Sequence, residues 1–258
     1  MTLKVLITGG AGFIGSALGK LLIDAHGAEV TAVDNLLEQV HPTGEPPESF
    51  DSRIRLVRAD VRDRDSWRSL FANYQPDYVA RFAAETGTAQ SLTESARHSS
   101  VNVLGTSELL DALVAAGQRP KKILLSSSRS IYGEGAWQAE SGEVFYPGRR
   151  SHKQLASAQW DFFGPDGKVA RPLPHKAGTT FATPSSIYAA TKLAPDNILG
   201  RWCEAFNVPL AILRFQNLYG PGQSPTNPYT GSINICHRVP ASARVIHSSP
   251  DAPTCRAV

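Results

Sequence analysis

The chain has 258 residues, of which 41% are hydrophobic and 19% are charged, and its formal net charge is +3. This composition is typical of a globular protein with a large core, and it excludes an intrinsically disordered chain. The basic residues are scattered and form no stripe with interleaved aromatic residues, so a nucleic-acid-binding surface is not expected.

The cysteines and the amino terminus bear on the compartment of the protein. Cys203, Cys236 and Cys255 have neither the spacing of metal ligands nor that of a redox pair, which indicates free thiols in a reducing compartment. The apolar run at residues 3–7 is too short for a signal sequence or a membrane span. We therefore expect a cytoplasmic protein without a metal site.

Predicted strands and helices alternate through the first half of the chain. Buried strands are predicted from short apolar runs at residues 5–8, 29–33, 54–57, 78–82 and 122–126. Helices are predicted from helical spacing of apolar residues at 13–25, 65–74 and 101–116, with a Pro- and Gly-rich loop at 41–47. This order predicts a doubly wound parallel α/β sheet that binds its ligands at the carboxyl ends of the strands.

The alternation stops at residues 133–184, where Gly, Pro, Ser and His are frequent and no period persists, so this segment is interpreted as an insertion. After it, residues 185–206 predict a helix and residues 210–215 predict a sixth strand. Pro195 lies inside that helix and predicts a kink or a break. No element is predicted for the last two dozen residues.

Gly9, Gly12 and Gly15 follow the first predicted strand and open the first helix. Their spacing allows a tight turn, a close approach of the backbone to a pyrophosphate, and close packing of the helix on the strand. Asp34 ends the second strand, where a carboxylate can bind ribose hydroxyls and repel a phosphate. These residues predict a dinucleotide site that prefers NAD to NADP.

Tyr188 and Lys192 lie four residues apart and therefore on one face of the predicted helix. A lysine ammonium near the phenol would lower the pKa of the tyrosine from its usual value of about 10. Such a tyrosine can act as an acid and a base beside a dinucleotide that exchanges hydride. The sequence therefore predicts an NAD-linked catalytic site.

In chain order these motifs resemble the extended short-chain dehydrogenase/reductase family, which has a Rossmann fold, over about residues 3–231. The matching features are the glycine turn, Asp34, Asp60, Ala83-Ala84, Ser126-Ser127-Ser128 with Tyr132-Gly133, and Tyr188 with Lys192. Within the family, residues 85–91, 130–135 and 227–231 resemble a branch of NAD-dependent nucleotide-sugar epimerases and dehydratases that includes dTDP-rhamnose 4-epimerases.

The resemblance implies that Tyr188 is the catalytic acid and base, that Lys192 lowers its pKa and binds the nicotinamide ribose, and that Ser128 hydrogen-bonds the reacting hydroxyl. Asn102 would support a proton path. The residues implied to bind NAD are Gly9, Gly12, Phe13, Ile14, Gly15, Asp34, Asn35, Asp60, Val61, Ala83, Ala84, Tyr188 and Lys192. Those implied to bind the substrate are Glu85, Thr86, Ser128 and Asn217.

Some of these residues also have a simpler interpretation from the sequence alone. Asp60 at a strand end is also typical of a turn or a helix cap, and Ala83 and Ala84 are also typical of a packed sheet end. The stretch from Asn217 to Gly222 also predicts a turn. No metal ligand set is predicted, because the insertion lacks the cysteine pairs that the branch often has.

Epimerisation, dehydration and reduction of a nucleotide sugar share this machinery. In the dehydratases of the family an Asp-Glu pair follows the catalytic Ser or Thr, whereas Arg129 and Ser130 follow Ser128 here. This difference argues against dehydration, although Glu85 is one nearby acid. The expected activity is NAD-dependent epimerisation at C4, and a ketosugar reductase and an NAD-binding protein without turnover stay as alternatives.

The expected organisation is an NAD-binding domain at residues 1–220, with an insertion at about 134–184, followed by a remnant of a substrate-binding region at 221–258. Relatives continue past residue 231 with a strand and helices, whereas residues 232–258 are interpreted as a truncated or out-of-frame end. We therefore expect weak or absent turnover. The resemblance also implies a homodimer through the helices at 101–116 and 185–206.

Overall fold

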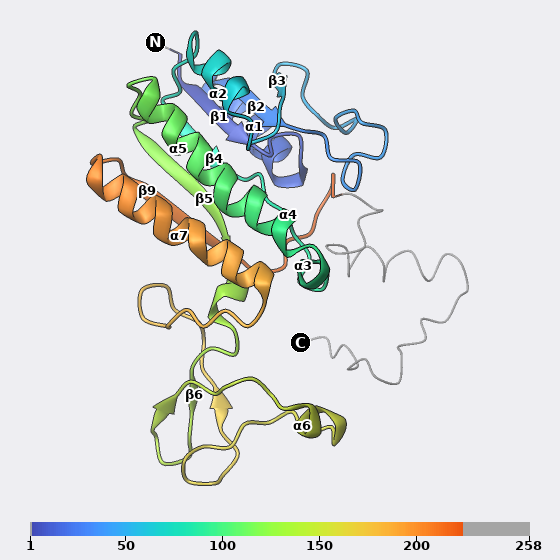
Figure 1. The fold of residues 1–258 in the computed structure, drawn as a ribbon, viewed down its shortest axis with the longest axis vertical. Helices are drawn as coiled ribbons and strands as arrows, with labels where there is room; N and C mark the ends of the chain where they lie inside the picture. Colours follow the sequence, from blue (N-terminus) through green and yellow to red (C-terminus); the bar gives the residue numbers. More distant parts are fainter. Residues whose placement is uncertain (1, 224–258) are drawn as a thin grey trace.

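The computed structural model describes residues 2–223 and contains a sheet of six parallel strands in the order β3-β2-β1-β4-β5-β9 (Figure 1). The strands are β1 (Lys4–Thr8), β2 (Glu29–Asp34), β3 (Arg55–Arg58), β4 (Tyr78–Arg81), β5 (Lys122–Ser128) and β9 (Leu210–Phe215). The order reverses between β1 and β4, so the carboxyl ends of these two strands border a crevice. The predicted doubly wound sheet is confirmed.

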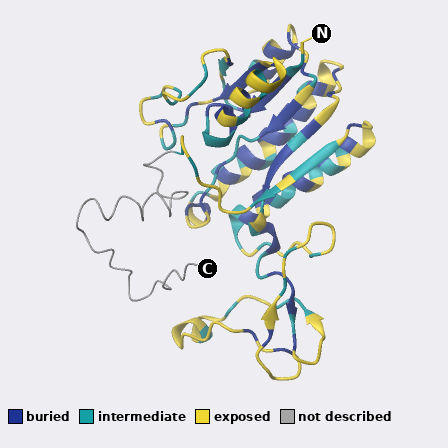
Figure 2. Ribbon diagram, turned by 180° about the vertical axis from the view of Figure 1, so that it is seen from behind, coloured by how far each residue is buried: buried dark blue, intermediate teal, exposed yellow. Residues whose placement is uncertain are grey.

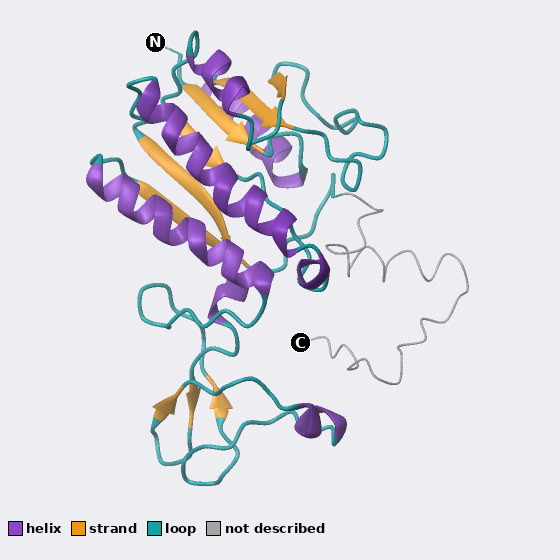
Figure 3. Ribbon diagram, viewed as in Figure 1, coloured by secondary structure: helices purple, strands orange, loops and turns teal. Residues whose placement is uncertain are grey.

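Helices cover the two faces of the sheet, which buries the apolar side chains of each face. On one face, α2 (Arg64–Phe71), α5 (Gly105–Ala115) and α7 (Ile187–Ala205) pack over a cluster that includes Leu6, Leu109 and Leu199. On the other face, α1 (Phe13–His26) packs with Leu18 and Leu22 over Val5 and Ile7. Figure 3 shows that β2 and β3 are joined by a loop instead of a helix.

The sheet strands agree with the sequence to within two residues at each end, but three helices differ. The helix α2 ends at Phe71 rather than at residue 74. The helix expected at 101–116 begins earlier, as α4 (Ser95–Ser99), and passes through a π-helical turn, η1 (Ser100–Leu104), into α5. Of the kink or break expected at Pro195, the break is wrong, because α7 runs unbroken through this residue (Figure 1). Packing of α7 on β5, β9 and η1 holds the helix across the missing backbone hydrogen bond.

The insertion forms a small lobe that extends away from the sheet domain and is largely exposed (Figure 2). It contains an antiparallel sheet, β7-β6-β8, formed by β6 (Trp137–Gln138), β7 (Val144–Phe145) and β8 (Arg171–Pro172), together with the short helix α6 (His152–Ala156). The rings of Trp137 and Phe162 meet edge to face at 4.9 Å in its centre. The insertion was predicted, whereas its three strands were not.

Residues 2–223 contain no helix that is both long and apolar enough to cross a membrane. The interpretation of residues 232–258, and most of the expected remnant at 221–258, falls outside the described residues.

Candidate active site

The carboxyl ends of the parallel strands border a cleft of 1290 Å³. Its lining includes the glycine turn after β1, the serines at the end of β5, and Tyr188 and Lys192 on α7. A second pocket of 150 Å³ lies beside it, and Gly9, Gly12 and Ala84 border both. The residues predicted from separate motifs are thus brought to one edge of the sheet, as the topology requires.

The turn between β1 and α1 has a shape that only glycine can form. Gly9 has a φ of +67°, and a Cβ atom there would lie 2.6 Å from the backbone nitrogen of Ala83. A Cβ atom on Gly15 would collide with the carbonyl oxygen of Gly9. Gly12 caps α1, and Phe13 and Ile14 follow it on the cleft wall. The amino terminus of α1 therefore faces the cleft over a bare backbone, which is the setting that binds a diphosphate.

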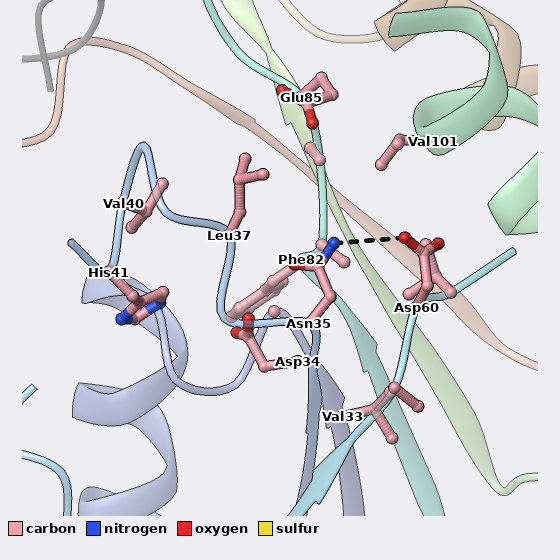
Figure 4. A pocket seen from close by; sticks show the side chains of 16 residues that line it. Val33, Asp34, Asn35, Leu37, Val40, His41, Asp60, Phe82, Glu85 and Val101 are labelled. Atoms are coloured by element: carbon pink, nitrogen blue, oxygen red, sulfur yellow. Dashed lines mark hydrogen bonds between the residues drawn. The ribbon is translucent and has the colours of Figure 1, made fainter. Parts of the chain in front are cut away.

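Asp34, at the end of β2, lies in the smaller pocket (Figure 4). Its carboxylate accepts hydrogen bonds from the backbone N–H groups of Ala11 and Leu36, both at 3.0 Å. These two donors fix the carboxylate next to the glycine turn and leave lone pairs for further donors. A fixed negative charge at this position fits ribose hydroxyls and repels a ribose phosphate.

Asn35 and Asp60 form the next part of the same pocket. The Asn35 amide donates to the Asp60 carboxylate at 3.2 Å, as the dashed line in Figure 4 shows. Arg62 binds the same carboxylate, and this hydrogen bond lowers the pKa of Asp60. Val61, Ala83 and Ala84 also line the pocket, so the predicted cofactor residues of β2, β3 and β4 meet there.

The predicted substrate residues are divided between the two spaces. Thr86, Ser128 and Asn217 line the cleft. Glu85 instead lines the smaller pocket, is 7% exposed, and forms an ion pair with Arg97 at 2.9 Å. The paired, buried Glu85 carboxylate is therefore not a free acid on the cleft wall.

Tyr188 and Ser128, the residues predicted to be catalytic, both line the cleft. Ser186 caps α7 by accepting from the Ala189 N–H, and the Ser91 hydroxyl accepts from the Tyr188 N–H at 3.1 Å, which together place the first turn of α7. Ser128 is the last residue of β5. Burial raises the pKa of Tyr188 above its ordinary value, and the neighbouring Ser128 hydroxyl opposes this shift.

This direction differs from the expectation that Lys192 lowers the pKa of Tyr188. The Lys192 ammonium donates to the carbonyl oxygen of Ser126 at 2.6 Å and is itself 6% exposed. Burial and the charge of Arg81 lower the pKa of Lys192 to about 7, while Asp196 opposes this shift. The shared helix face was predicted correctly, but the lysine side chain reaches toward β5.

Arg81 is a contributor to this site that sequence reasoning missed. It ends β4, is 3% exposed, and donates to the Val101 carbonyl at 2.8 Å. Within residues 2–223 its Nε atom has no hydrogen-bond partner, and burial lowers the pKa of the guanidinium to about 10. The sequence feature that could have indicated Arg81 is a charged residue at the end of an otherwise apolar strand.

Asn102 lies in the π-helical turn η1 and ties two elements of the site together. Its Oδ1 atom accepts from the Glu85 N–H at 2.8 Å, and its Nδ2 atom donates to the Glu85 carbonyl at 3.1 Å and to the Thr191 hydroxyl at 3.0 Å. Asn102 thereby joins the loop after β4 to the helix that carries Tyr188. A π-helical turn contains one residue more than an α-helical turn, and such turns are frequent at functional sites.

The fold and these pockets define a dinucleotide-binding α/β protein of the Rossmann type, since the glycine cradle and the fixed Asp34 carboxylate fit a dinucleotide and lead to Tyr188. The chain belongs to the NAD dependent epimerase/dehydratase family, whose model matches residues 5–151 and 161–251. This match extends past residue 231, where the resemblance was expected to end, so that limit was wrong.

Three known proteins that are similar to this chain are also epimerases or dehydratases of nucleotide sugars. A dTDP-L-rhamnose 4-epimerase of Burkholderia thailandensis is 47% identical over 94% of this chain and 65% of its own length. A dTDP-glucose 4,6-dehydratase of Shigella flexneri is 30% identical over 86% of this chain and 56% of its own. The structure of a UDP-glucose 4-epimerase of Thermus thermophilus in complex with NAD has a TM-score of 0.66 and 27% identity, over 93% of this chain and 63% of the other. The chain thus spans less than two thirds of each of these three proteins.

Proposed function

We propose that the protein catalyses NAD-dependent epimerisation at C4 of a nucleotide-linked sugar, with a dTDP-linked 6-deoxysugar as the first candidate substrate. The observation that carries the proposal is the convergence of Ser128, Tyr188 and Lys192 with the glycine turn on the wall of one cleft. The 47% identity to the Burkholderia 4-epimerase supports the choice of reaction and of nucleotide.

The cofactor would lie across both pockets. Its diphosphate would face Gly12, Phe13 and Ile14, its adenosine would be held by Asp34 and Asp60, and its nicotinamide ribose would lie near Lys192. An ammonium has three donors, and Ser126 uses one, so Lys192 keeps donors for ribose hydroxyls. NAD bound here would supply the hydride acceptor and donor that the sugar carbon needs.

The proton chemistry belongs to Tyr188 and Ser128. As hydride leaves C4, the attached hydroxyl must lose its proton, and the Tyr188 phenolate accepts it while the Ser128 hydroxyl donates a hydrogen bond to the same sugar oxygen. On reduction of the keto sugar, Tyr188 returns the proton. Because both steps exchange one proton at one oxygen, a single acid and base serves the whole cycle.

The neighbours of Ser128 favour epimerisation over dehydration. Loss of water across C5 and C6 needs a carboxylate to take the C5 proton and an acid to protonate the leaving oxygen. Arg129 and Ser130 line the cleft directly after Ser128, and Glu85 is buried in an ion pair with Arg97. None of these three groups is a free carboxylate facing the cleft.

Incubation of the purified protein with NAD and dTDP-L-rhamnose, followed by proton NMR, tests the proposal. Inversion at C4 without added reductant is the expected result. A 4-keto-6-deoxy product formed from dTDP-glucose would indicate a dehydratase, and turnover that requires NADH would indicate a reductase. Bound NAD without turnover of any of these sugars would indicate a cofactor-binding protein and would overturn the proposal.

The wider organisation is part of the same proposal. Residues 1–220, with the insertion at 134–184, would form the NAD-binding domain, and 221–258 would contribute to the substrate region. A homodimer would form through the helices at 95–115 and 187–205, where Leu104 and Val114 are 46% and 43% exposed. The free, buried thiol of Cys203 fits a cytoplasmic setting. Light scattering of the purified protein measures its oligomeric state.

A further inference from the structure

Gln39 joins the segment after β2 to the helices after β4. The Nε2 atom of Gln39 donates to the Oε1 atom of Gln90 at 3.3 Å, and the Nε2 atom of Gln90 donates to the Oε1 atom of Gln39 at 3.1 Å. Gln90 is the first residue of the short helix α3 (Gln90–Thr93) and is 6% exposed. Arg97 on α4 donates to the same Gln39 oxygen at 3.3 Å. We call these three side chains, Gln39, Gln90 and Arg97, the bridge.

Charged partners fix the orientation of the two amides in the bridge. A guanidinium can only donate, so the Gln39 atom that Arg97 contacts is the oxygen. A carboxylate can only accept, so the Gln90 atom that contacts Glu94 at 3.0 Å is the nitrogen. Arg97 is itself held by ion pairs with Glu94 at 2.7 Å and with Glu85 at 2.9 Å. The side of the bridge that follows β4 is therefore a preformed set of partners for the Gln39 side chain.

The bridge spans the carboxyl end of β1. In the sheet β1 lies between β2 and β4, so a direct contact between the segments that follow β2 and β4 crosses the end of β1, where the glycine turn lies. Both segments also line the smaller pocket, with Val40 and His41 on the first and Glu85 on the second (Figure 4). Val40 and His41 border the larger cleft as well. A dinucleotide bound over the glycine turn would therefore lie between the sheet and the bridge.

We propose that the bridge closes over the adenosine end of bound NAD and opens each time NAD enters or leaves, with Gln39 as the positioning residue that closes it. The inference rests on the cofactor placement proposed above and not on the sugar reaction. The start of the segment after β2 is held independently, because Leu36 has a φ of +52° and donates its N–H to Asp34. Loss of the bridge therefore leaves the Asp34 carboxylate in place for the ribose. Because the bridge opens for entry and release alike, it slows both rates and changes the affinity little.

Stopped-flow fluorescence of NADH, which gains a signal beside the protein's tryptophans, measures both rates without turnover. Excess NAD displaces bound NADH and gives the release rate. Gln39→Met keeps the length of the side chain and removes its hydrogen bonds, so entry and release should both become about tenfold faster, while the dissociation constant changes by less than about threefold. Gln90→Met should have an equal or smaller effect, because Arg97 still holds Gln39, and the double variant should match Gln39→Met. Gln159→Met, at an exposed position of the insertion, is the control and should leave both rates unchanged.

Faster release without faster entry in Gln39→Met would overturn the inference, because the bridge would then only support the bound state. Unchanged rates in both Gln39→Met and Gln90→Met would overturn it as well. Circular dichroism shows whether each variant is folded, and Gln90→Met gives the same test if Gln39→Met is not. A wild-type protein that binds no NADH would refute the cofactor placement together with the bridge. Faster exchange in the variants of a protein that epimerises no sugar would support the bridge and refute only the proposed function.

Discussion

The Lys192 ammonium on α7 donates a hydrogen bond to the carbonyl oxygen of Ser126 on β5 at 2.6 Å. This contact fixes the long, flexible side chain of Lys192, which lies four residues after Tyr188, between α7 and β5. It also holds a charge in a buried place beside a second cation, Arg81, which is why the pKa of Lys192 is lowered to about 7. Stability and cofactor binding should both depend on this buried lysine.

We expect Lys192→Met to stabilise the protein at pH 6, and by less at pH 9. The pKa of Lys192 falls from 10.5 to about 7 on folding, so the unfolded chain binds more protons between these values. The stability of the wild type relative to the variant therefore rises with pH across this window, and the cost of the buried charge is fully present below pH 7. Urea unfolding at the two pH values, without added cofactor, measures the difference.

The exposed Lys176 provides the control for this experiment. Lys176→Met exchanges the same side chains outside the site, so its effect on stability should be small and equal at pH 6 and pH 9. If Lys192→Met also had equal effects at the two pH values, Lys192 would titrate alike in the folded and unfolded chain, and the lowered pKa would be refuted.

Gly9→Ala should prevent formation of the turn that faces the dinucleotide. An alanine pays about 1 kcal/mol for the positive φ, and its Cβ atom would lie 2.6 Å from the Ala83 nitrogen. Relief of that overlap costs about 1 to 3 kcal/mol more. We therefore expect a total loss of roughly 2 to 4 kcal/mol of unfolding free energy, measured by denaturant titration, together with loss of NAD binding.

A Gly44→Ala variant separates the conformational cost of Gly9→Ala from its steric cost. The φ of +68° at Gly44 matches the +67° of Gly9, but a Cβ atom there would meet only the end of Arg58 at 3.6 Å. Gly44→Ala should therefore cost about 1 kcal/mol. Equal losses at the two positions would mean that the contact with Ala83 does not explain the glycine at position 9.

Asp34→Asn should weaken NAD binding about tenfold, because a charge-assisted hydrogen bond to the ribose becomes a neutral one. The amide oxygen can still accept from one of the Ala11 and Leu36 N–H groups, so the turn keeps part of its support. Binding of NADP should weaken less or improve, since the repulsion of the ribose phosphate is removed. Calorimetric titration of both cofactors measures the ratio, and an unchanged ratio would argue against the assigned role of Asp34.

The parts of the site that depend on backbone shape could be predicted from the sequence. Gly9 and Asp34 stand at the ends of apolar strands, and parallel topology forces those ends to meet. The strand β9 coincides with the predicted residues 210–215 for a similar reason, because a short apolar run between turns has few alternatives.

The parts that depend on side-chain direction could not be predicted. The spacing of Tyr188 and Lys192 places them on one helix face but does not choose between the phenol and the Ser126 carbonyl as the partner of the ammonium. Glu85 follows Ala84 directly, yet it faces Arg97 in the smaller pocket, which depends on the course of the chain after β4. The π-helical turn at Asn102 arises from tertiary hydrogen bonds to Glu85 and Thr191 that local spacing does not contain.

Those hydrogen bonds lead to a last prediction, that Asn102→Ala destabilises the protein more than Thr191→Val. The alanine leaves the Glu85 N–H and carbonyl and the Thr191 hydroxyl without this partner in a buried place, which costs roughly 2 to 4 kcal/mol. Thr191→Val removes the contact with Asn102 and the donation to the Tyr188 carbonyl, but it leaves the Glu85 backbone paired, so about 1 kcal/mol is expected. Urea unfolding of both variants gives the two values. If they were equal, the link between Asn102 and Glu85 would contribute nothing to stability, and the π-helical turn would need another explanation.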